Sequence, residues 1–303
     1  MKAVVLHEYG GPDKLKYEDA PDPEPGEAQV LVRVAAASIN PIDWKMRSGA
    51  AKERFPVEFP AILGRDLSGT VRSVGAKVEG FTPGDKVMAL AWATYAELCV
   101  VNAADLIHLP DGMDLAEAAA VPLVTLTGDQ LISLGTNIQK GQTVLVAGAL
   151  GSVGRSAVFT AKQAGAVVIA GVRKAQKQEA QELGADEVIA LDDDSDLERL
   201  GFIDAVADTV NGETAQKLIA KVKQGGVYGS VVGPPANAKL HPTVGVQPIM
   251  AKPDAAKLHW LAEHVAAGKL RIPIDRMVPL EDAAKAHATA EKGGVGGKIL
   301  LLA

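Results

Sequence analysis

The sequence predicts an α/β protein in which a doubly wound parallel sheet is joined to a β-rich, partly closed barrel. At 303 residues the chain exceeds the roughly 250 to 300 residues at which a single core stops growing, so we expect two domains. Residues 1–110 show many short strand patterns separated by turns. From Thr143 onward strand and helix patterns alternate, as in parallel sheets covered by helices.

The first part of the chain alternates apolar runs with turn residues. Strands are predicted at residues 3–6, 29–35, 67–74 and 86–90. The three prolines of residues 21–25 predict a rigid loop, because each proline fixes φ and removes an N–H donor. A connecting helix is expected from Leu115 to Leu134, capped by Asp114 and broken near Pro122.

The second part predicts the doubly wound sheet and a return to the first domain. Strands are predicted at residues 144–147, 167–171, 187–191, 202–208 and 226–232, with helices at 153–164, 175–183 and 213–222. Residues 236–248 show no regular pattern. Helices at 254–267 and 281–291 and strands at 275–278 and 298–302 follow. The last strand is expected to pair within the first domain, because apolar chain ends are usually anchored by a sheet.

A glycine-rich turn follows the strand at 144–147 and precedes the helix at 153–164. This order indicates a dinucleotide site, because backbone N–H groups and the positive end of a helix dipole reach a pyrophosphate only where no Cβ intervenes. An ordinary glycine-rich turn is the alternative. The predicted cofactor contacts at this turn are Gly148, Leu150, Gly151, Ser152, Val153 and Gly154.

The end of the next strand favours NADP(H) over NAD(H). An NAD site usually places Asp or Glu about 20 residues past the glycines, where it accepts hydrogen bonds from the ribose. Here the strand runs into Arg173 and Lys174, with Lys177 one turn later and no carboxylate before Glu179. Arg and Lys bind phosphate, so these three cations are predicted to hold the 2′-phosphate. The alternative is a solvated helix start.

Composition limits the classes of partner and location. A net charge of −6 gives no reason to expect nucleic acid or an anionic membrane as a partner. No apolar run approaches the ~20 residues of a membrane span, and no signal-peptide pattern follows Met1, so we expect a cytoplasmic protein. The single cysteine, Cys99, cannot build a disulfide or a zinc site alone, and it is expected to be a buried packing residue.

Several stretches together resemble the zinc-independent quinone oxidoreductases of the medium-chain dehydrogenase/reductase superfamily, over essentially the whole chain. They are residues 38–45 (SINPIDWK), 63–69 (LGRDLSG), 84–87 (GDKV), 117–123 (EAAAVPL), 144–154 (VLVAGALGSVG), 183–186 (LGAD), 208–210 (DTV) and 297–300 (GKIL). The resemblance implies a discontinuous GroES-like catalytic domain (1–121 and 255–303), a Rossmann NADP(H)-binding domain (122–254), an active site between them, and a homodimer.

The resemblance also implies site residues. Asn40 is expected to face the nicotinamide and substrate and to donate to a developing oxyanion; a turn residue before Pro41 is the alternative and is compatible with it. Further cofactor contacts are implied for Thr127, Val210 and Gly233, and for Lys298 where many relatives have an arginine nearby.

No metal site is expected. Zinc alcohol dehydrogenases of the superfamily carry a ligand cysteine near Ser38 and a Gly-His-Glu where this chain has Gly64-Arg65-Asp66. Arg65 cannot ligate a cation, because tetrahedral zinc needs thiolate or imidazole ligands. Arg65 and Asp66 are expected to form an ion pair that fills this position.

Without a Lewis acid, hydride transfer from NADPH suits a conjugated acceptor, because the negative charge ends on an oxygen that hydrogen bonds stabilise. The sequence therefore predicts an NADPH-dependent reductase of a quinone or an α,β-unsaturated carbonyl. Two alternatives stay open: an enoyl-thioester reductase of the same architecture, and an NADPH-binding sensor or partner protein without turnover.

Overall fold

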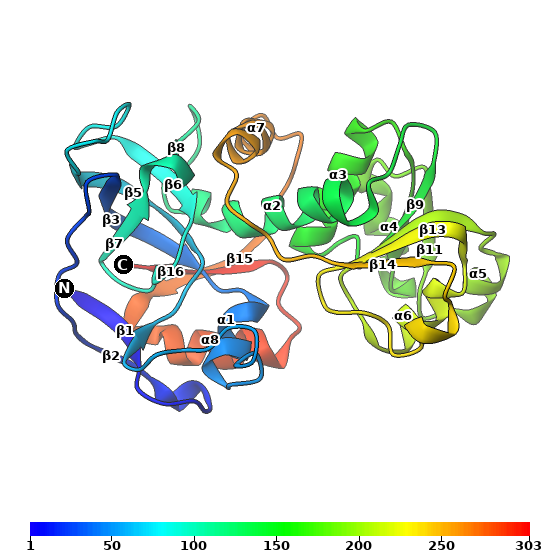
Figure 1. The fold of residues 1–303 in the computed structure, drawn as a ribbon, viewed down its shortest axis with the longest axis horizontal. Helices are drawn as coiled ribbons and strands as arrows, with labels where there is room; N and C mark the ends of the chain where they lie inside the picture. The colour runs from blue at the N-terminus through cyan, green and yellow to red at the C-terminus, as the bar shows by residue number, and fades with distance from the viewer. The chain divides into compact units, whose positions relative to one another are not determined.

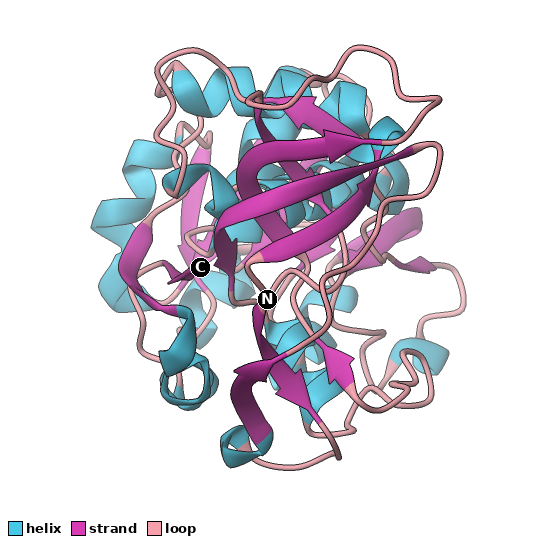
Figure 2. Ribbon diagram, turned by 90° about the vertical axis from the view of Figure 1, so that its left-hand side faces the viewer, coloured by secondary structure: helices cyan, strands magenta, loops and turns pink.

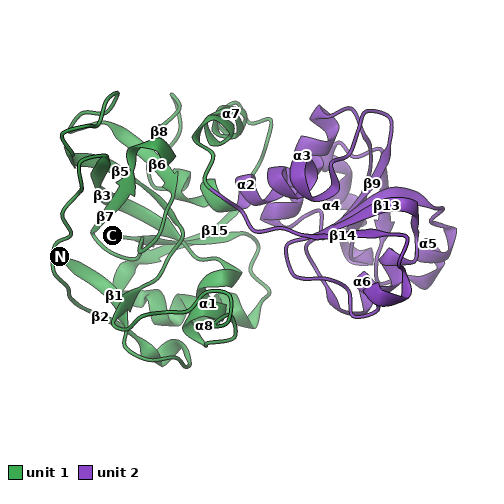
Figure 3. Ribbon diagram, viewed as in Figure 1, with its two compact units in different colours: residues 1–123, 253–303 green, residues 124–252 purple.

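The computed structural model describes all 303 residues, which form two compact units (Figures 1 and 3). Unit 1 comprises Met1–Leu123 and Pro253–Ala303, and unit 2 comprises Val124–Lys252. Each boundary lies two residues from the position expected from the sequence.

Unit 2 is built on a sheet of six parallel strands in the order β11-β10-β9-β12-β13-β14. The strands are β9 (Thr143–Ala147), β10 (Val167–Val172), β11 (Glu187–Ala190), β12 (Ile203–Asp208), β13 (Val222–Ser230) and β14 (Gly245–Pro248). The order runs outward in both directions from β9 and β12, which is the doubly wound topology predicted from the sequence.

The sheet of unit 2 has a core on each face. Side chains alternate along β9, so that Val144 and Val146 pack with Val158 of α3, whereas Leu145 packs on the other face with Leu218 of α6. The helices of this unit are α3 (Ser152–Gln163), α4 (Lys177–Ala180), α5 (Asp194–Arg199) and α6 (Gly212–Ile219). Burial on both faces explains the continuous apolar strands of the sequence.

Unit 1 contains a partly closed barrel. Its larger sheet has the order β15-β16-β3-β5-β6-β8, with β7 also paired to β3, and β2-β1-β4 form a smaller sheet. The strands are β1 (Lys2–Leu6), β2 (Leu15–Asp19), β3 (Gln29–Ser38), β4 (Ala61–Ile62), β5 (Asp66–Val74), β6 (Lys86–Leu90), β7 (Leu98–Asn102), β8 (Leu106–His108), β15 (Ile274–Pro279) and β16 (Lys298–Leu302). Figure 2 shows how strands dominate this unit.

β3 is long enough to pair with different strands along its length. Its first half pairs with β7 and its last three residues pair with β16, both on the edge opposite β5. As predicted, the C-terminal strand therefore returns to the N-terminal domain.

Helices of unit 1 lie around these sheets. They are α1 (Pro41–Arg47), α7 (Ala255–Ala266) and α8 (Ala283–Lys292), and α2 (Pro122–Gln130) begins in unit 1 and continues into unit 2. The helical run Glu117–Thr136 has the length and mean hydropathy (1.2) of a membrane span, but 83% of it is buried, as in the core helix of a soluble protein.

Several elements differ from the sequence prediction. The helix expected at 175–183 contains only one α-helical turn, α4, between two short 3-10 segments. The helix expected to reach Val222 ends at Ile219, because Val222 already begins β13. The irregular stretch 236–248 contributes the edge strand β14, and α1, α5, β2, β4, β7 and β8 were not predicted.

Candidate functional site

The glycine turn of unit 2 connects β9 to α3 through positions that exclude side chains. Gly148 has φ +77°, and a Cβ there would lie 2.4 Å from Thr209 Oγ1. A Cβ on Gly154 would lie 2.1 Å from the carbonyl oxygen of Gly148. Gly154 therefore lets the start of α3 pack directly against the turn, and Gly148 lets the turn pack against Thr209, which follows β12.

The start of α3 presents unused backbone donors. Its first helical hydrogen bond runs from Arg155 N to Gly151 O (2.8 Å), so the N–H groups of Ser152, Val153 and Gly154 precede the helical ladder. Gly151 is the N-cap and supplies no side-chain cap. This arrangement fits the pyrophosphate of a dinucleotide, which bare N–H groups and the helix dipole would hold.

Three other predicted contacts lie in unit 2. Val210 follows β12 and Gly233 follows β13, so both are near the carboxyl ends of neighbouring strands, where α/β sheets bind ligands. A Cβ on Gly233 would meet nothing within 4 Å, so this position is open. Thr127 lies half-buried in α2. Leu150 is also half-buried, and its carbonyl accepts from Arg155 Nε (3.0 Å).

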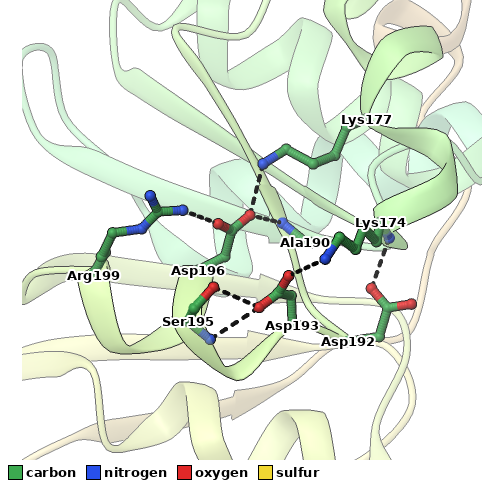
Figure 4. Close-up of polar contacts among 8 residues, drawn as sticks. All are labelled: Lys174, Lys177, Ala190, Asp192, Asp193, Ser195, Asp196 and Arg199. Atoms are coloured by element: carbon green, nitrogen blue, oxygen red, sulfur yellow. Dashed lines mark hydrogen bonds and ion pairs between the residues drawn. The ribbon is translucent and has the colours of Figure 1, made fainter.

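Two of the three cations after β10 meet carboxylates from the segment that follows the neighbouring strand β11. Lys174 Nζ lies 2.7 Å from Asp193 Oδ2, and Lys177 Nζ lies 2.7 Å from Asp196 Oδ2 (Figure 4). Arg173 is exposed, and its guanidinium has no carboxylate partner. Asp193 and Asp196 each lie 19 residues beyond the lysine that they pair with, so the sequence pattern after β10 does not reveal them.

In unit 1 Asn40 lies in a buried polar cluster. Its side chain is 1% exposed, and Nδ2 donates to Asp66 Oδ2 (2.8 Å) and, at 3.2 Å, to the Ser38 carbonyl. Its Oδ1 accepts from Lys298 Nζ at 2.5 Å. The hydrogen bond expected from Asn40 to a developing oxyanion would therefore require this cluster to rearrange.

Lys298 belongs to the same cluster. Its ammonium also donates to the Ile39 carbonyl (2.9 Å), and burial lowers its pKa, although Asp66 and Asp43 oppose the shift. The structure thus places Lys298 on Asn40 in unit 1, and the cofactor contact implied by the resemblance would require the ammonium to leave both bonds.

A chain of buried polar groups extends from this cluster toward the surface. Asp43 accepts from the Asn40 N–H and from the Tyr95 hydroxyl, both at 2.8 Å. The Tyr95 hydroxyl lies 3.3 Å from His287 Nε2, and His287 Nδ1 lies 3.3 Å from an Arg47 nitrogen. Arg47 is 1% exposed and pairs with the half-exposed Glu291 (2.7 Å).

Burial governs the titration of this chain. It raises the pKa of the Asp43 carboxyl to about 6, although hydrogen bonds from Tyr95 and Asn40 oppose the shift. Burial and the positive charge of Arg47 lower the pKa of His287 to about 3. Asp43 accepts from the N-cap residue Asn40 at the start of α1, but Tyr95, His287 and Arg47 carry no sequence pattern that joins them to Asn40.

The expected ion pair between Arg65 and Asp66 is not formed. Arg65 instead donates to the Ala91 carbonyl (3.0 Å), and its guanidinium stacks 3.6 Å from the ring centroid of Trp92. Asp66 accepts from Ser38 Oγ (2.5 Å) and from Leu123 N (2.5 Å). Arg65 lies in the bend before β5 and Asp66 is the first residue of that strand, and each side chain is held by partners of its own.

Cys99 and the possibility of a metal site remain to be placed. Cys99 is 2% exposed, and burial raises the pKa of its thiol to about 12, as expected for a packing residue. No group of three or more His, Cys, Asp or Glu side chains is arranged to hold a metal ion.

Comparisons with known proteins agree with this architecture. Residues 26–111 match the family model of the alcohol dehydrogenase GroES-like domain, and residues 183–301 match that of zinc-binding dehydrogenases. The mouse mitochondrial NAD(P)H oxidoreductase RTN4IP1 is 32% identical over 99% of this chain and 89% of its own length.

Solved structures extend the likeness to the whole chain. The quinone oxidoreductase from Coxiella burnetii is 32% identical, with a TM-score of 0.91, and the match covers 100% of this chain and 99% of that one. A mycobacterial protein solved with NADPH, 28% identical, has a TM-score of 0.85 and is matched over 100% of both chains. The family models, the relatives and the doubly wound sheet beside a GroES-like barrel show that the chain belongs to the quinone oxidoreductase family of the medium-chain dehydrogenase/reductase superfamily.

Proposed function

We propose that this NAD(P)H-dependent oxidoreductase uses NADPH to reduce a quinone or an α,β-unsaturated carbonyl, without zinc. The observation that carries the cofactor choice is the end of β10, where Arg173 stands exposed without a carboxylate partner and two lysines follow. The NADPH bound by a related structure supports the same choice.

The chain's own residues provide the binding site. The unused N–H groups at the start of α3 hold the pyrophosphate. Gly148 and Gly154 let the turn pack closely against Thr209 and against the start of α3, which fixes these N–H groups in place. Arg173 binds the 2′-phosphate, because a planar guanidinium donates paired hydrogen bonds to phosphate oxygens. The bound cofactor supplies the hydride.

A conjugated acceptor fits the polar residues of unit 1 better than an isolated ketone. The positions expected to ligate zinc carry Ser38, Arg65 and Asp66, and the first and third of these are hydrogen-bonded to each other. The buried Lys298 ammonium provides positive charge near Asp66 and Asp43 in place of a metal ion. Reduction of a quinone or enone needs no Lewis acid, since the acceptor spreads the charge itself.

In this proposal Asn40 holds the loop before α1 in position. Its backbone N–H holds Asp43, and its amide joins Asp66 to Lys298, so the loop that precedes α1 is fixed. Asn40 can donate to an oxyanion only if it gives up one of these hydrogen bonds. Its main contribution to activity is therefore to fix the position of this loop.

The names of the relatives favour a quinone as the acceptor. An enoyl-thioester reductase remains the second enzymatic candidate, and a nucleotide sensor without turnover is a third. A panel of quinones, short enones, 2-alkenals and enoyl thioesters separates them, because only the sensor leaves NADPH unoxidised by every acceptor. We also propose a cytoplasmic homodimer that binds neither membranes nor nucleic acid.

The cofactor choice is tested by Arg173→Ala. Loss of a charge-assisted phosphate contact is expected to raise the KM for NADPH roughly 10-fold or more and to leave the KM for NADH unchanged. Lys239→Ala, which removes an exposed cation elsewhere in unit 2, is the matched control. An unchanged KM for NADPH in Arg173→Ala would contradict the assignment.

A further inference from the structure

The segment after β11 carries carboxylates that compete for the cations after β10. β10 and β11 are adjacent parallel strands, so their carboxyl ends meet at the same edge of the sheet. Asp192 Oδ1 accepts from the backbone N–H of Lys174 (2.7 Å), and Asp193 Oδ2 accepts from the Lys174 ammonium (2.7 Å). Figure 4 shows the two aspartates beside this lysine.

The two ion pairs of this edge differ in construction. Asp196 is 6% exposed, accepts from the Ala190 N–H (2.8 Å), and is bonded by both Lys177 and Arg199. Three groups therefore fix this carboxylate, which anchors α5 against β11. The pair of Lys177 with Asp196 is part of the fold.

The pair of Lys174 with Asp193 is exchangeable. The Lys174 side chain is 72% exposed, and exposed ion pairs are weak because water and salt screen them. Hydrogen bonds from Lys174 and Ser195 lower the pKa of Asp193, so its negative charge is present at neutral pH. Lys174 can thus leave Asp193 for a stronger anion.

This pair affects the two cofactors differently. A 2′-phosphate that binds Lys174 must displace the Asp193 carboxylate from it and then lie near that negative charge. A 2′-hydroxyl needs neither step. Arg173 does not share this competition, since no carboxylate pairs with it.

We propose that Asp193 is a specificity-determining residue that restrains the preference for NADPH over NADH by holding Lys174. This inference rests on the proposed NADPH site. In this inference Arg173 binds the 2′-phosphate without competition, whereas Asp193 competes with the phosphate for Lys174. The wild-type protein therefore binds both cofactors with a modest preference for NADPH.

The test is Asp193→Asn. Asparagine is as good an N-cap as aspartate, so the bonds of Asp193 to Ser195 at the start of α5 can be kept while the charge is removed. Asp194→Asn is the matched control, because it removes the same charge one residue along, from a carboxylate that pairs with Lys217. Dissociation constants for NADPH and NADH are measured by titrating nicotinamide fluorescence, without an acceptor.

We expect Asp193→Asn to tighten NADPH binding roughly 3- to 10-fold, the effect of removing one nearby charge from a phosphate site at moderate salt, with NADH binding unchanged within about twofold. The gain should shrink as salt increases, and it should be smaller in the Lys174→Gln background, where only the repulsion between Asp193 and the phosphate is relieved. Asp194→Asn should change neither cofactor.

Three outcomes would overturn the inference: equal changes for both cofactors, no change for NADPH, or the same gain in Asp194→Asn, which would show a general charge effect. Failure of the proposed function looks different. In that case wild-type protein would bind NADPH no better than NADH, and Arg173→Ala would leave NADPH binding unchanged.

Discussion

At the residue scale, Asp43 is a buried carboxyl whose proton affinity rises on folding, from a pKa of 3.8 to about 6. Such a group contributes most to stability below about pH 4, and this contribution is lost as the pH rises through 6. His287 acts in the opposite direction: its pKa falls from 6.5 to about 3, so its contribution is present above 6.5 and is lost in acid.

We predict that Asp43→Asn changes the pH dependence of stability. An amide has no charge to bury, so the unfolding free energy of the variant relative to wild type should increase by roughly 3 kcal/mol from pH 4 to pH 7. The His287 contribution is common to both proteins and cancels in this comparison. Urea unfolding at each pH measures the difference, and exposed Asp194→Asn is the control. A difference that stays constant with pH would contradict the burial of an ionisable Asp43.

Substitution of Lys298 distinguishes a structural role of this residue from a role in cofactor binding. Lys298→Gln removes the buried cation near Asp66 and Asp43, and we expect it to destabilise the protein by about 3 to 5 kcal/mol, because two buried carboxyls lose their compensation. Its dissociation constant for NADPH should stay within about twofold of the wild type. Thermal unfolding and cofactor titration measure both effects, with exposed Lys292→Gln as the control. Weaker NADPH binding at unchanged stability would instead assign Lys298 to the cofactor.

At this scale the sequence correctly predicts the position of residues that are consecutive in the chain. The glycine turn and the cations after β10 lie at the edge of the sheet where they were expected. The prediction failed where partners are far apart in the chain: His287 and Tyr95 are 192 residues apart, and Lys298 and Asn40 are 258 apart. Asp193 was missed for the same reason, because it lies 19 residues from Lys174 in the chain, in the loop after β11.

At the element scale, the strand, turn and helix of β9 and α3 form one unit whose packing depends on Gly154. We predict that Gly154→Ala weakens NADPH binding at least 10-fold, because the new Cβ would overlap the Gly148 carbonyl and push α3 away from the turn. Gly201→Ala, where a Cβ meets nothing within 4 Å, is the control and should bind normally. Cofactor titration measures NADPH binding by the two variants. Normal binding by Gly154→Ala would contradict the proposed pyrophosphate site at this turn.

The elements that the sequence missed are those with little periodicity. α5 has six residues and β14 four, too short for a helical or alternating pattern to stand out. β14 is an edge strand whose side chains are mostly exposed, so its sequence lacks the apolar run of the central strands. The long buried strands β9 and β12 were predicted within one residue of their observed ends.

At the scale of the whole molecule, all three tryptophans, Trp44, Trp92 and Trp260, belong to unit 1, whereas the predicted cofactor turn belongs to unit 2. Tryptophan fluorescence therefore reports the unfolding of unit 1, and far-UV circular dichroism reports both units. We predict that NADPH shifts the circular dichroism transition to higher urea more than the fluorescence transition, because a ligand stabilises the unit that binds it. Equal shifts by both probes would show that the units unfold as one.

The central claim is a reduction of conjugated acceptors that prefers NADPH to NADH and needs no metal. Its most direct measurement is kcat/KM for quinone reduction with NADPH and with NADH, before and after dialysis against a chelator. The account predicts a higher kcat/KM with NADPH, lost in Arg173→Ala, and no effect of the chelator. Equal use of the two cofactors by wild type and Arg173→Ala, or activity that disappears with the chelator and returns with zinc, would contradict it.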